Sequence, residues 1–341
     1  MSLPLVFSEN IKTIDISKII LAGDVGGTKT NLALYTIEGN NKSLLQEKLY
    51  KSKHYKSFAD IVSDFLNELP LPEAVCIGVA GPVLKGKVKL TNLPWDIDTA
   101  EIAAGIGIAV SDVHLINDLE ATAYGLAMLT EKDIVVIHKG CSEPVGNVAV
   151  IAPGTGLGEA GLFWDGKFYN PFATEGGHCD FAPRNKFDFE LYEYLQNKFG
   201  HVCWERMVCG LGIFNIYQFL RDVKKREEQD WLAQKISEGD PAAVIGQNIE
   251  QSAICKETMQ LFIRFLAYES SNLVLKFKAT GGLFIGGGIA PQLIPYFEEY
   301  LFSDYFCSSG RMDPMLESVP VKIILNTKTA LLGAAYYAAN N

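Results

Sequence analysis

The chain has 341 residues, 48% of them hydrophobic, so it can bury a large core and is long enough for two domains. Its formal net charge of −10 argues against a broad basic surface of the kind that binds nucleic acid or anionic lipid, and leaves room for a local basic pocket. The sequence therefore predicts a globular protein that acts on a small partner.

The start of the chain and its cysteines favour a cytoplasmic location. Residues 1–19 lack a basic start followed by an apolar core, and no apolar run in the sequence approaches the length of a membrane span. The seven cysteines are an odd number without a Cys-x-x-Cys pair, which fits neither a disulfide framework nor a common zinc site. We expect most of them to be buried, reduced thiols.

The stretch from Ile19 to Leu34 predicts a strand, a tight turn and a second strand, because two apolar runs flank Gly26-Gly27-Thr28-Lys29. Glycines let main-chain N–H groups approach a phosphate, and the Thr28 hydroxyl can hydrogen-bond a phosphate oxygen. Asp24, just before the turn, suits a Mg²⁺ ion or its water shell. The pattern is neither a P-loop nor a dinucleotide fingerprint, and an ordinary hairpin turn explains this stretch equally well.

The residues that follow alternate between helix and strand patterns, which predicts an α/β layer architecture. Apolar residues recur at helical spacing from Ser57 to Leu69, and Ala74 to Val79 is a continuously apolar strand. A further strand is predicted over Val83 to Leu90. The polar loop 91–95 then carries Trp95, which either contacts a ligand or anchors a surface turn in the core.

Asn117 and Asp118 follow a predicted helix over 98–106 and a predicted strand over 113–116. A helical pattern begins directly after them, so Asp118 stands at a strand end and at or near a helix start. Ligands of open α/β sheets collect at that edge. Asn and Asp are also preferred N-caps, so either residue could serve the helix alone, and the two roles are compatible.

The strand and glycine-turn pattern returns from Val148. An apolar strand over 148–152 leads into Pro153-Gly154-Thr155-Gly156-Leu157-Gly158, and 160–164 predicts the return strand. Two such units, each with a hydroxyl in its turn, can close on one phosphate chain from opposite sides. The repetition favours a phosphate ligand over two unrelated turns.

The segment 174–181 reads Thr-Glu-Gly-Gly-His-Cys-Asp-Phe, a glycine-containing loop rich in hydrogen-bonding side chains. Glu175 and His178 lack both the helical His-Glu-x-x-His spacing and a third ligand, which argues against a metal site. A carboxylate and an imidazole also suit a sugar, whose hydroxyls donate and accept hydrogen bonds.

The rest of the chain adds core elements and a third glycine turn. Helices are predicted over 188–198, 254–275 and 329–339, and strands over 283–285 and 321–325. Gly286-Gly287-Gly288 follows the first of these strands. Such a backbone can lie against a flat adenine ring, although a close helix–strand crossing explains the glycines as well.

Three glycine turns in this order, with Ile-Asn-Asp between the first two and Glu-Gly-Gly-His after the second, resemble the bacterial glucokinase family. The resemblance runs from Gly23 to the last helix. It also includes Thr91-Asn92 with Trp95, Gly200-His201-Val202 with Glu205-Arg206, and Leu331-Leu332-Gly333.

The zinc-free branch of these sugar kinases is the better match. The group that contains repressors has a cysteine-rich zinc motif after Glu-Gly-Gly-His, which is missing from this sequence together with an N-terminal DNA-binding extension. Two residues depart from the family pattern: Pro153, and Lys29, where some relatives have Asn. Neither removes a group that the mechanism needs.

The resemblance implies an α/β fold of the two-domain sugar kinase/actin-like (ribonuclease H-like) type with a central cleft. A small domain would comprise residues 1–116, completed by the C-terminal helix at about 327–341, and a large domain would comprise residues 117–326. The resemblance further implies a homodimer. The acidic net charge and the lack of a long apolar run argue against nucleic acid and membrane as partners.

The resemblance also assigns site residues. Glucose would be bound by Asn117, Asp118, Glu175, His178 and Glu205. ATP would be bound by Gly23, Asp24, Gly26, Gly27, Thr28, Gly154 and Thr155 on its phosphate side and by Gly287 near the adenosine, with Asp24 on Mg²⁺ through water. Asp118 would be the general base that accepts the proton of the glucose 6-hydroxyl as this oxygen attacks the γ-phosphorus, giving glucose 6-phosphate and ADP.

Other interpretations stay open at this point. A kinase for another hexose or an amino sugar would keep the fold, because Glu175 and His178 do not distinguish glucose from mannose or N-acetyl sugars. Asp118 and the two phosphate turns argue against a non-catalytic sugar-binding regulator, and the sugar-type loops argue against an actin-like filament. ADP or polyphosphate could replace ATP, since some related sugar kinases use these donors.

Overall fold

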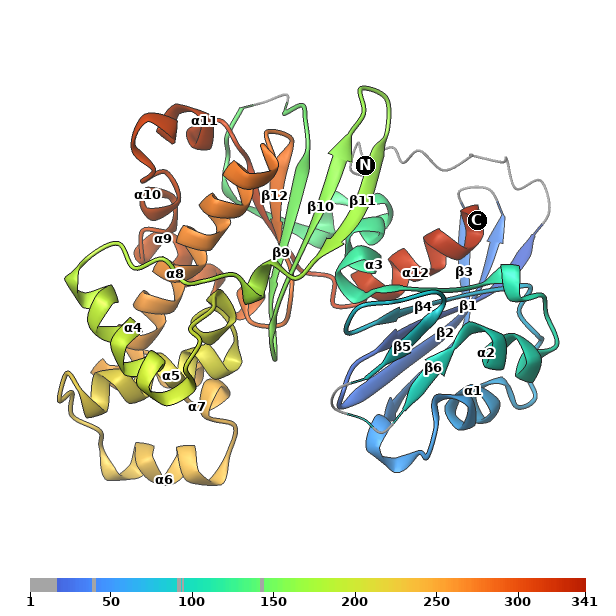
Figure 1. Cartoon of the computed structure of the whole chain (residues 1–341), viewed down its shortest axis with the longest axis horizontal. Helices are drawn as coiled ribbons and strands as arrows, with labels where there is room; N and C mark the ends of the chain where they lie inside the picture. Colours follow the sequence, from blue (N-terminus) through green and yellow to red (C-terminus); the bar gives the residue numbers. More distant parts are fainter. Residues whose placement is uncertain (1–16, 39–40, 91–92, 94, 142–143) are drawn as a thin grey trace. The chain divides into compact units, whose positions relative to one another are not determined.

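The computed structural model describes residues 17–38, 41–90, 93, 95–141 and 144–341 (Figure 1). They form two compact units. The first unit comprises the described residues up to Asp133 together with Leu162–Ala173 and Asn326–Asn341, and the second comprises Ile134–Gly161 and Thr174–Leu325. The domain boundaries expected from the sequence, at 116 and 326, stay predictions.

A five-stranded sheet with the order β3-β2-β1-β4-β7 forms the first unit (Figure 1). Its strands are β1 Lys18–Val25, β2 Lys29–Glu38, β3 Asn41–Lys51, β4 Ala74–Val79 and β7 Val113–Asn117. β2 pairs antiparallel with β1 and β3, whereas β1, β4 and β7 run parallel. The strand–turn–strand prediction for the opening stretch and the strand predictions at 74–79 and 113–116 are confirmed. The carboxyl ends of the three parallel strands lie along one edge of the sheet.

The α-helices of the first unit are α1 Phe58–Leu66, α2 Thr99–Ile106, α3 Asp118–Gly125 and α12 Thr329–Asn340. Ser57 and Asp60 form a capping box at the start of α1, which explains why this helix begins where the sequence predicted. α12 packs on α3, β1 and β4. A Cβ at Gly333 would lie only 1.7 Å from the carbonyl oxygen of Ala121, so the missing side chain lets α12 approach α3 closely.

The strand predicted over Val83–Leu90 is wrong for most of its length. Only β5, Lys87–Lys89, is a strand there, and it pairs with β6, Asp96–Asp98. The backbone has a φ of 51° at Lys85 and 73° at Gly86, so the chain turns where an extended strand was expected.

Trp95 confirms the interpretation of a buried anchor. Its side chain is 2% exposed, and its indole N–H donates to the Tyr55 carbonyl at 3.3 Å. The neighbouring Thr91, Asn92 and Pro94 lie outside the described residues.

A six-stranded sheet with the order β11-β10-β9-β12-β13-β8 contributes its larger part to the second unit. Its strands are β8 Ile134–His138, β9 Val148–Pro153, β10 Leu157–Trp164, β11 Tyr169–Thr174, β12 Gly282–Ile285 and β13 Val321–Ile324. β9, β12 and β13 are parallel, and β8 pairs antiparallel with β13 at the edge. The predicted strands over 148–152, 160–164, 283–285 and 321–325 are confirmed.

Helices surround the core of the second unit, and α8 is the longest of those described. They are α4 Lys186–Phe199, α5 Gly210–Asp222, α6 Asp230–Glu238, α7 Pro241–Gln247, α8 Ala253–Phe277, α9 Ile294–Glu299, α10 Phe302–Phe306 and α11 Asp313–Glu317. α8 packs against β9, α5 and α10 and buries Phe262 and Phe265 completely. The helices predicted at 188–198, 254–275 and 329–339 are confirmed.

Cysteines in the structure are free thiols, and four of the seven, Cys76, Cys203, Cys209 and Cys255, are buried. This confirms that most are buried thiols. Burial raises the pKa of Cys209 and Cys255 to about 11, so both stay protonated at neutral pH. Among the described residues, none of the helices has the length and apolar character that a membrane span requires.

Candidate functional site

The first predicted phosphate turn is closed and braced by main-chain hydrogen bonds. The N–H of Gly26 donates to the carbonyl of Lys29 at 2.9 Å, between β1 and β2. Ser52, which follows β3, donates its N–H to the Thr28 carbonyl at 3.1 Å and its hydroxyl to the Gly26 carbonyl at 3.2 Å. Gly27 is half-buried and Thr28 is exposed. The turn is therefore fixed while the Thr28 side chain is accessible to a ligand.

Asp24 and Gly23 precede this turn in β1 and have different surroundings. Asp24 is half-buried, and its loss of hydration raises the pKa of its carboxyl above the ordinary value. Gly23 is buried, and a Cβ there would lie 2.6 Å from Cδ1 of Ile77 and 3.0 Å from Cδ2 of Leu32. Packing within the sheet accounts for Gly23, and its role in nucleotide binding stays a prediction.

Asn117 and Asp118 lie where β7 runs into α3. Asn117 is the N-cap, because its Oδ1 accepts the N–H groups of Leu119 at 2.8 Å and Glu120 at 3.3 Å. Oδ1 of Asp118 accepts the Leu119 N–H as well, at 2.9 Å. The capping role considered from the sequence is thus confirmed for Asn117. The same N–H orients the Asp118 carboxylate, which is half-buried.

A glycine in β4 lets the start of α3 pack closely on this strand, next to β1. In register, Asp24 of β1 lies opposite Gly78 of β4, and Gly78 lies opposite Ile116 of β7. A Cβ at Gly78 would lie 3.2 Å from Cβ of Ala121 and 3.7 Å from Cα of Asp118. Adjacent strands are about 4.8 Å apart, so roughly two such spacings separate Asp24 from β7, the strand that ends just before Asp118. The first unit therefore places the glycine turn, Asp24 and Asp118 along one sheet edge.

The second predicted phosphate turn joins β9 to β10. The N–H of Gly154 donates to the Gly156 carbonyl at 2.8 Å, and the Gly154 carbonyl accepts the N–H of Gly210 at 2.9 Å, at the start of α5. Thr155 is exposed at the tip of the turn. This turn, like the first, combines a fixed backbone with an accessible hydroxyl.

Glu205 lies directly against the second turn. Its Oε2 accepts the N–H of Leu157 at 3.0 Å, and a Cβ at Gly156 would lie 2.5 Å from the same oxygen. A glycine at 156 therefore leaves room for the Glu205 carboxylate. One predicted sugar ligand and one predicted phosphate turn are adjacent in the structure.

Glu175 and His178 belong to one short turn, in which Gly176–His178 is a 3-10 helix and the His178 N–H donates to the Glu175 carbonyl at 3.0 Å. A Cβ at Gly177 would lie 2.3 Å from the Leu157 carbonyl, so this turn packs against the start of β10. It also contacts the turn over Trp204–Arg206, which contains Glu205. The structure thus brings Glu175, His178 and Glu205 into one cluster beside the second glycine turn.

Gly287 lies behind that glycine turn. Its φ is 76°, and a Cβ there would lie 2.2 Å from the Pro153 carbonyl oxygen. The adjacent Gly286 donates its N–H to the Ile151 carbonyl at 2.8 Å, next to the pairing of β12 with β9. Backbone conformation and close packing both require a glycine at 287. A contact with the adenosine stays a prediction.

The part of the chain that the structure describes has no group of three or more His, Cys, Asp or Glu side chains that could hold an ion. Mg²⁺ bound to phosphates keeps several waters and needs only one or two carboxylates, so the half-buried Asp24 fits that kind of ion. Within the described ranges, Glu175 and His178 have no third side chain of this kind beside them.

Comparison with known proteins decides the family. The chain matches the Glucokinase family model over residues 21–341. A protein named glucokinase from Nostoc punctiforme is 40% identical over 339 residues, which is 94% of this chain and 99% of the relative. The chain belongs to the glucokinase family.

Solved structures agree with membership of the glucokinase family. A glucokinase from an Antarctic psychrotroph is 31% identical, has a TM-score of 0.79, and covers 95% of this chain and 99% of its own. A ROK family glucokinase from Streptomyces griseus, solved with glucose and AMPPNP, is 17% identical with a TM-score of 0.62, and covers 95% of this chain and 100% of its own. At that identity the likeness shows the fold alone. The chain has the α/β, actin-like ATPase fold of these sugar kinases.

Two departures from the pattern of the glucokinase family have a structural account. Pro153 ends β9, where a proline removes an N–H without interrupting the strand, and its carbonyl packs against Gly287. Lys29 is exposed, and its carbonyl rather than its side chain closes the first turn. The main-chain hydrogen bonds that close the two turns are therefore present with Pro153 and Lys29 at these positions.

Sequence reasoning missed Glu159 of β10 and Glu269 of α8. Their side chains are 1% and 0% exposed. The available signal was an acidic residue inside an apolar strand, between the small residues Gly158 and Ala160. Glu269 lies in the long helix α8. An acidic residue in such a helix is expected on its exposed face, so the sequence contains no signal that Glu269 is buried.

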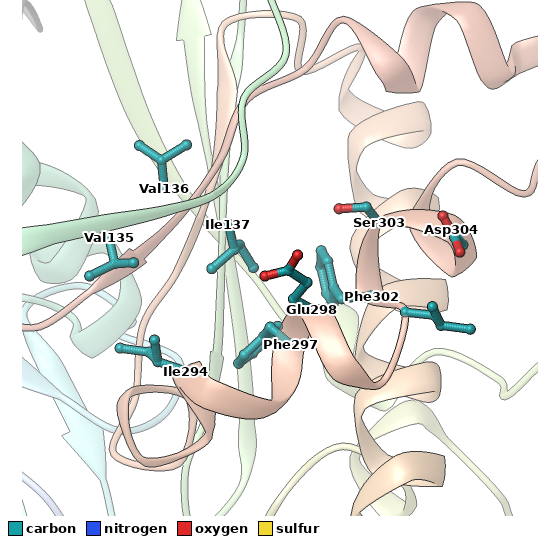
Figure 2. Close-up of a pocket in the computed structure, with 10 residues that line it drawn as sticks. Val135, Val136, Ile137, Ile294, Phe297, Glu298, Phe302, Ser303 and Asp304 are labelled. Carbon is teal, nitrogen blue, oxygen red and sulfur yellow. The ribbon is translucent and has the colours of Figure 1, made fainter.

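A groove elsewhere in the second unit has a volume of about 500 Å³ and lies between β8 and the helices α9 and α10 (Figure 2). Figure 2 shows mainly apolar side chains along it, among them Ile137, Phe297 and Phe302, with the Glu298 carboxylate beside them. None of the predicted site residues lines this groove. Because the predicted site residues lie elsewhere, this groove is not the candidate site.

Proposed function

We propose that this chain is a glucokinase, which transfers the γ-phosphoryl group of ATP to the 6-hydroxyl of glucose. The observation that carries the proposal is the family match over residues 21–341, a span that includes both glycine turns and every predicted sugar ligand. The relative from Streptomyces griseus, described as a complex with glucose and AMPPNP, supports a sugar and a nucleoside triphosphate as the two substrates.

The two glycine turns would bind the phosphates of ATP. Their main-chain N–H groups can approach an anion closely because glycine has no Cβ, and each turn has an exposed hydroxyl, at Thr28 and at Thr155. The proposed phosphate-side residues are Gly23, Asp24, Gly26, Gly27, Thr28, Gly154 and Thr155, with Gly287 near the adenosine. Asp24 would hold Mg²⁺ through water. When bound, this ion would neutralise negative charge on the phosphoryl oxygens.

Glucose would be bound by Asn117, Asp118, Glu175, His178 and Glu205. Carboxylates and an imidazole suit hydroxyl groups, because each hydroxyl donates one hydrogen bond and accepts others. Asp118 would act as the general base. With Oδ1 already oriented by the Leu119 N–H, the carboxylate can accept the proton of the 6-hydroxyl as that oxygen attacks phosphorus.

Three parts of the proposal have different support: the homodimer rests on the family resemblance alone, the Mg²⁺ ion on the resemblance and on Asp24, and the cytoplasmic location is an expectation from the sequence. Size-exclusion chromatography with light scattering measures the oligomeric state directly. A single species of twice the mass of the 37.5 kDa chain supports the dimer, and a monomer at micromolar concentration contradicts it.

The test of the function is ADP release by the purified protein with Mg-ATP. Glucose, mannose, fructose, N-acetylglucosamine and a sugar-free sample are compared side by side. Release that depends on glucose supports the proposal, whereas equal or faster release with another sugar makes the chain a kinase for that sugar. Binding of glucose without ADP release from any sugar would instead favour a non-catalytic regulator.

The same assay identifies the phosphoryl donor. Glucose 6-phosphate is measured with ATP, ADP or polyphosphate as the only donor. Product from ATP alone supports the proposed donor, and product from ADP or polyphosphate without ATP contradicts it.

A further inference from the structure

Glu159 and Glu269 are buried acids of the second unit whose carboxyl groups lie within hydrogen-bonding reach of each other. Glu159 is on β10 and is 1% exposed, and Glu269 is on α8 and is 0% exposed. Neither carboxylate oxygen of Glu159 accepts a hydrogen bond from a donor among the described residues. A fully buried carboxylate without donors is strongly disfavoured, whereas a carboxylic acid can donate a hydrogen bond from its O–H to a neighbouring carboxylate.

Charges around the pair favour a single proton on the Glu159 side. Glu269 accepts a hydrogen bond from Nδ2 of Asn272 at 2.8 Å and is 3.3 Å from Nζ of Lys276, and the Arg184 guanidinium is also within its electrostatic reach. Burial, and next the charge of Glu269, raise the pKa of Glu159 to about 8. Burial also raises the pKa of Glu269, but Asn272 and Lys276 favour its ionised form. Glu159 is therefore the acid and Glu269 the carboxylate.

The Glu159 side chain touches the turn that contains Glu175 and His178. A Cβ at Gly176 would lie 2.0 Å from Oε2 of Glu159, so this carboxyl group occupies the space beside the Gly176 backbone. The Thr174 hydroxyl donates to the Glu159 carbonyl at 2.9 Å, and the Gly176 N–H donates to the Thr174 hydroxyl at 3.2 Å. Both the carbonyl and the carboxyl group of Glu159 thus contact the base of this turn.

We propose that Glu159 is a positioning residue for sugar binding: its carboxylic acid keeps its proton, donates a hydrogen bond to Glu269 and so holds the turn with Glu175 and His178 in the conformation that binds the sugar. The sugar part of this inference rests on the proposed function. When the proton leaves to solvent, two buried carboxylates face each other and Oε2 lies against Gly176 without a donor. The turn then moves to admit water, and Glu175 and His178 lose their fixed positions.

A pH profile of glucose KM and kcat tests the proposal in the wild type, Glu159→Gln and Glu159→Ala. Glutamine keeps the shape and a donor but cannot lose a proton. In the wild type we expect glucose KM to rise about fivefold or more from about pH 7 to 9, with kcat changing less than about twofold. Glu159→Gln should lack this rise, and Glu159→Ala should have a raised KM throughout.

Glu193→Gln is the matched control, because Glu193 is an exposed glutamate on α4 of the same unit. It should retain the wild-type profile. If Glu159→Gln shows the same KM rise as the wild type, the proton on Glu159 is not what holds the turn and the proposal is wrong. A folded Glu159→Ala protein with wild-type KM would contradict it equally.

Hydrogen exchange in the free protein separates this inference from the proposed function, because it needs no sugar. Exchange of the amides of residues 174–178 is measured near pH 7 and pH 9 and corrected for the chemical exchange rate. The wild type should lose protection at the higher pH, and Glu159→Gln should keep it. Equal protection changes in both proteins would overturn the inference even if the enzyme phosphorylates glucose. The predicted difference would support it even if glucose is not the substrate.

Discussion

The carboxylate of Glu205 accepts the N–H of Leu157 at 3.0 Å, directly behind the second glycine turn. Its main chain is fixed as well, since the Cys209 thiol donates to the Glu205 carbonyl at 2.9 Å. A residue proposed to bind the sugar is therefore attached to a turn proposed to bind phosphate. This arrangement makes the effect of changing Glu205 specific enough to predict.

Glu205→Gln should raise glucose KM about tenfold and change ATP KM less than about twofold, because charge-assisted hydrogen bonds are stronger than neutral ones. The amide oxygen of glutamine still accepts the Leu157 N–H, so the turn should keep its shape. Initial rates with each substrate varied in turn measure both constants. Glu193→Gln serves as the control, and an unchanged glucose KM in Glu205→Gln would remove this residue from the sugar site.

Asp118→Asn should lower kcat about a hundredfold or more while the protein stays folded and binds glucose. The asparagine oxygen can still accept the Leu119 N–H, but an amide cannot take a proton from the sugar. Steady-state kinetics and glucose titration by calorimetry measure the two effects. The control is Asp240→Asn at the start of α7, where the aspartate caps a helix through the N–H groups of Ala242 and Ala243. Near-normal turnover by Asp118→Asn would exclude the proposed base.

Thr28→Ala should raise ATP KM about tenfold, because a hydrogen bond to a charged phosphate is lost while glucose binding is unaffected. The main chain of the turn should persist, since Thr28 contributes its carbonyl to the bond from Ser52. Kinetics with ATP varied at saturating glucose measure the change. Ser43→Ala, at an exposed position on β3, is the control. Unchanged ATP KM and kcat would count against the first turn as a phosphate site.

Gly333→Ala should destabilise the first unit by about 3 kcal/mol or more, because the added Cβ overlaps the Ala121 carbonyl of α3. Gly105→Ala is a matched change in α2, at a position with nothing within 4 Å of the new Cβ, and should stabilise the helix by about 0.5–1 kcal/mol. Denaturant unfolding of both variants measures the difference. Similar stabilities for the two would show that α12 and α3 are not packed as closely as the structure has them.

The stability of the second unit should fall as pH rises from about 4.5 to 8, since burial and the Glu269 charge raise the pKa of Glu159 from 4.5 to about 8. In this window the folded chain keeps a proton that the unfolded chain has lost, so raising the pH favours unfolding. The contribution of Glu159 to the free energy of unfolding is complete below its pKa in the unfolded chain. It is lost as the pH approaches its pKa in the folded protein. The slope is about 1.4 kcal/mol per pH unit for one proton.

Glu159→Gln should remove most of that slope, and Glu193→Gln should keep it. Urea unfolding of the three proteins at several pH values between about 5.5 and 7.5 gives the comparison. Parallel curves for the wild type and Glu159→Gln would mean that Glu159 is ionised in the folded protein.

Local elements were predictable because they depend on neighbours in the sequence. The strand–turn–strand around Gly26 and the helix that begins after Ser57 follow from apolar spacing, glycine and a capping residue. The same local reading failed at Val83–Leu90, because positive φ at Lys85 and Gly86 turns a chain whose composition favours a strand. β3, β8 and the helices α5 to α7 were not predicted, although β8 and α5 each have a clear apolar pattern in the sequence.

By itself, the sequence determined the family, the order of the glycine turns and the position of Asp118 between a strand and a helix. Only the tertiary structure decided that Gly23 and Gly287 are required by packing, that Glu205 lies on the second turn, and that Glu159 is buried against Gly176. These relationships join residues that are distant in the chain. Whether an acid in β10 faces water or another acid depends on where α8 packs, and no local pattern contains that information.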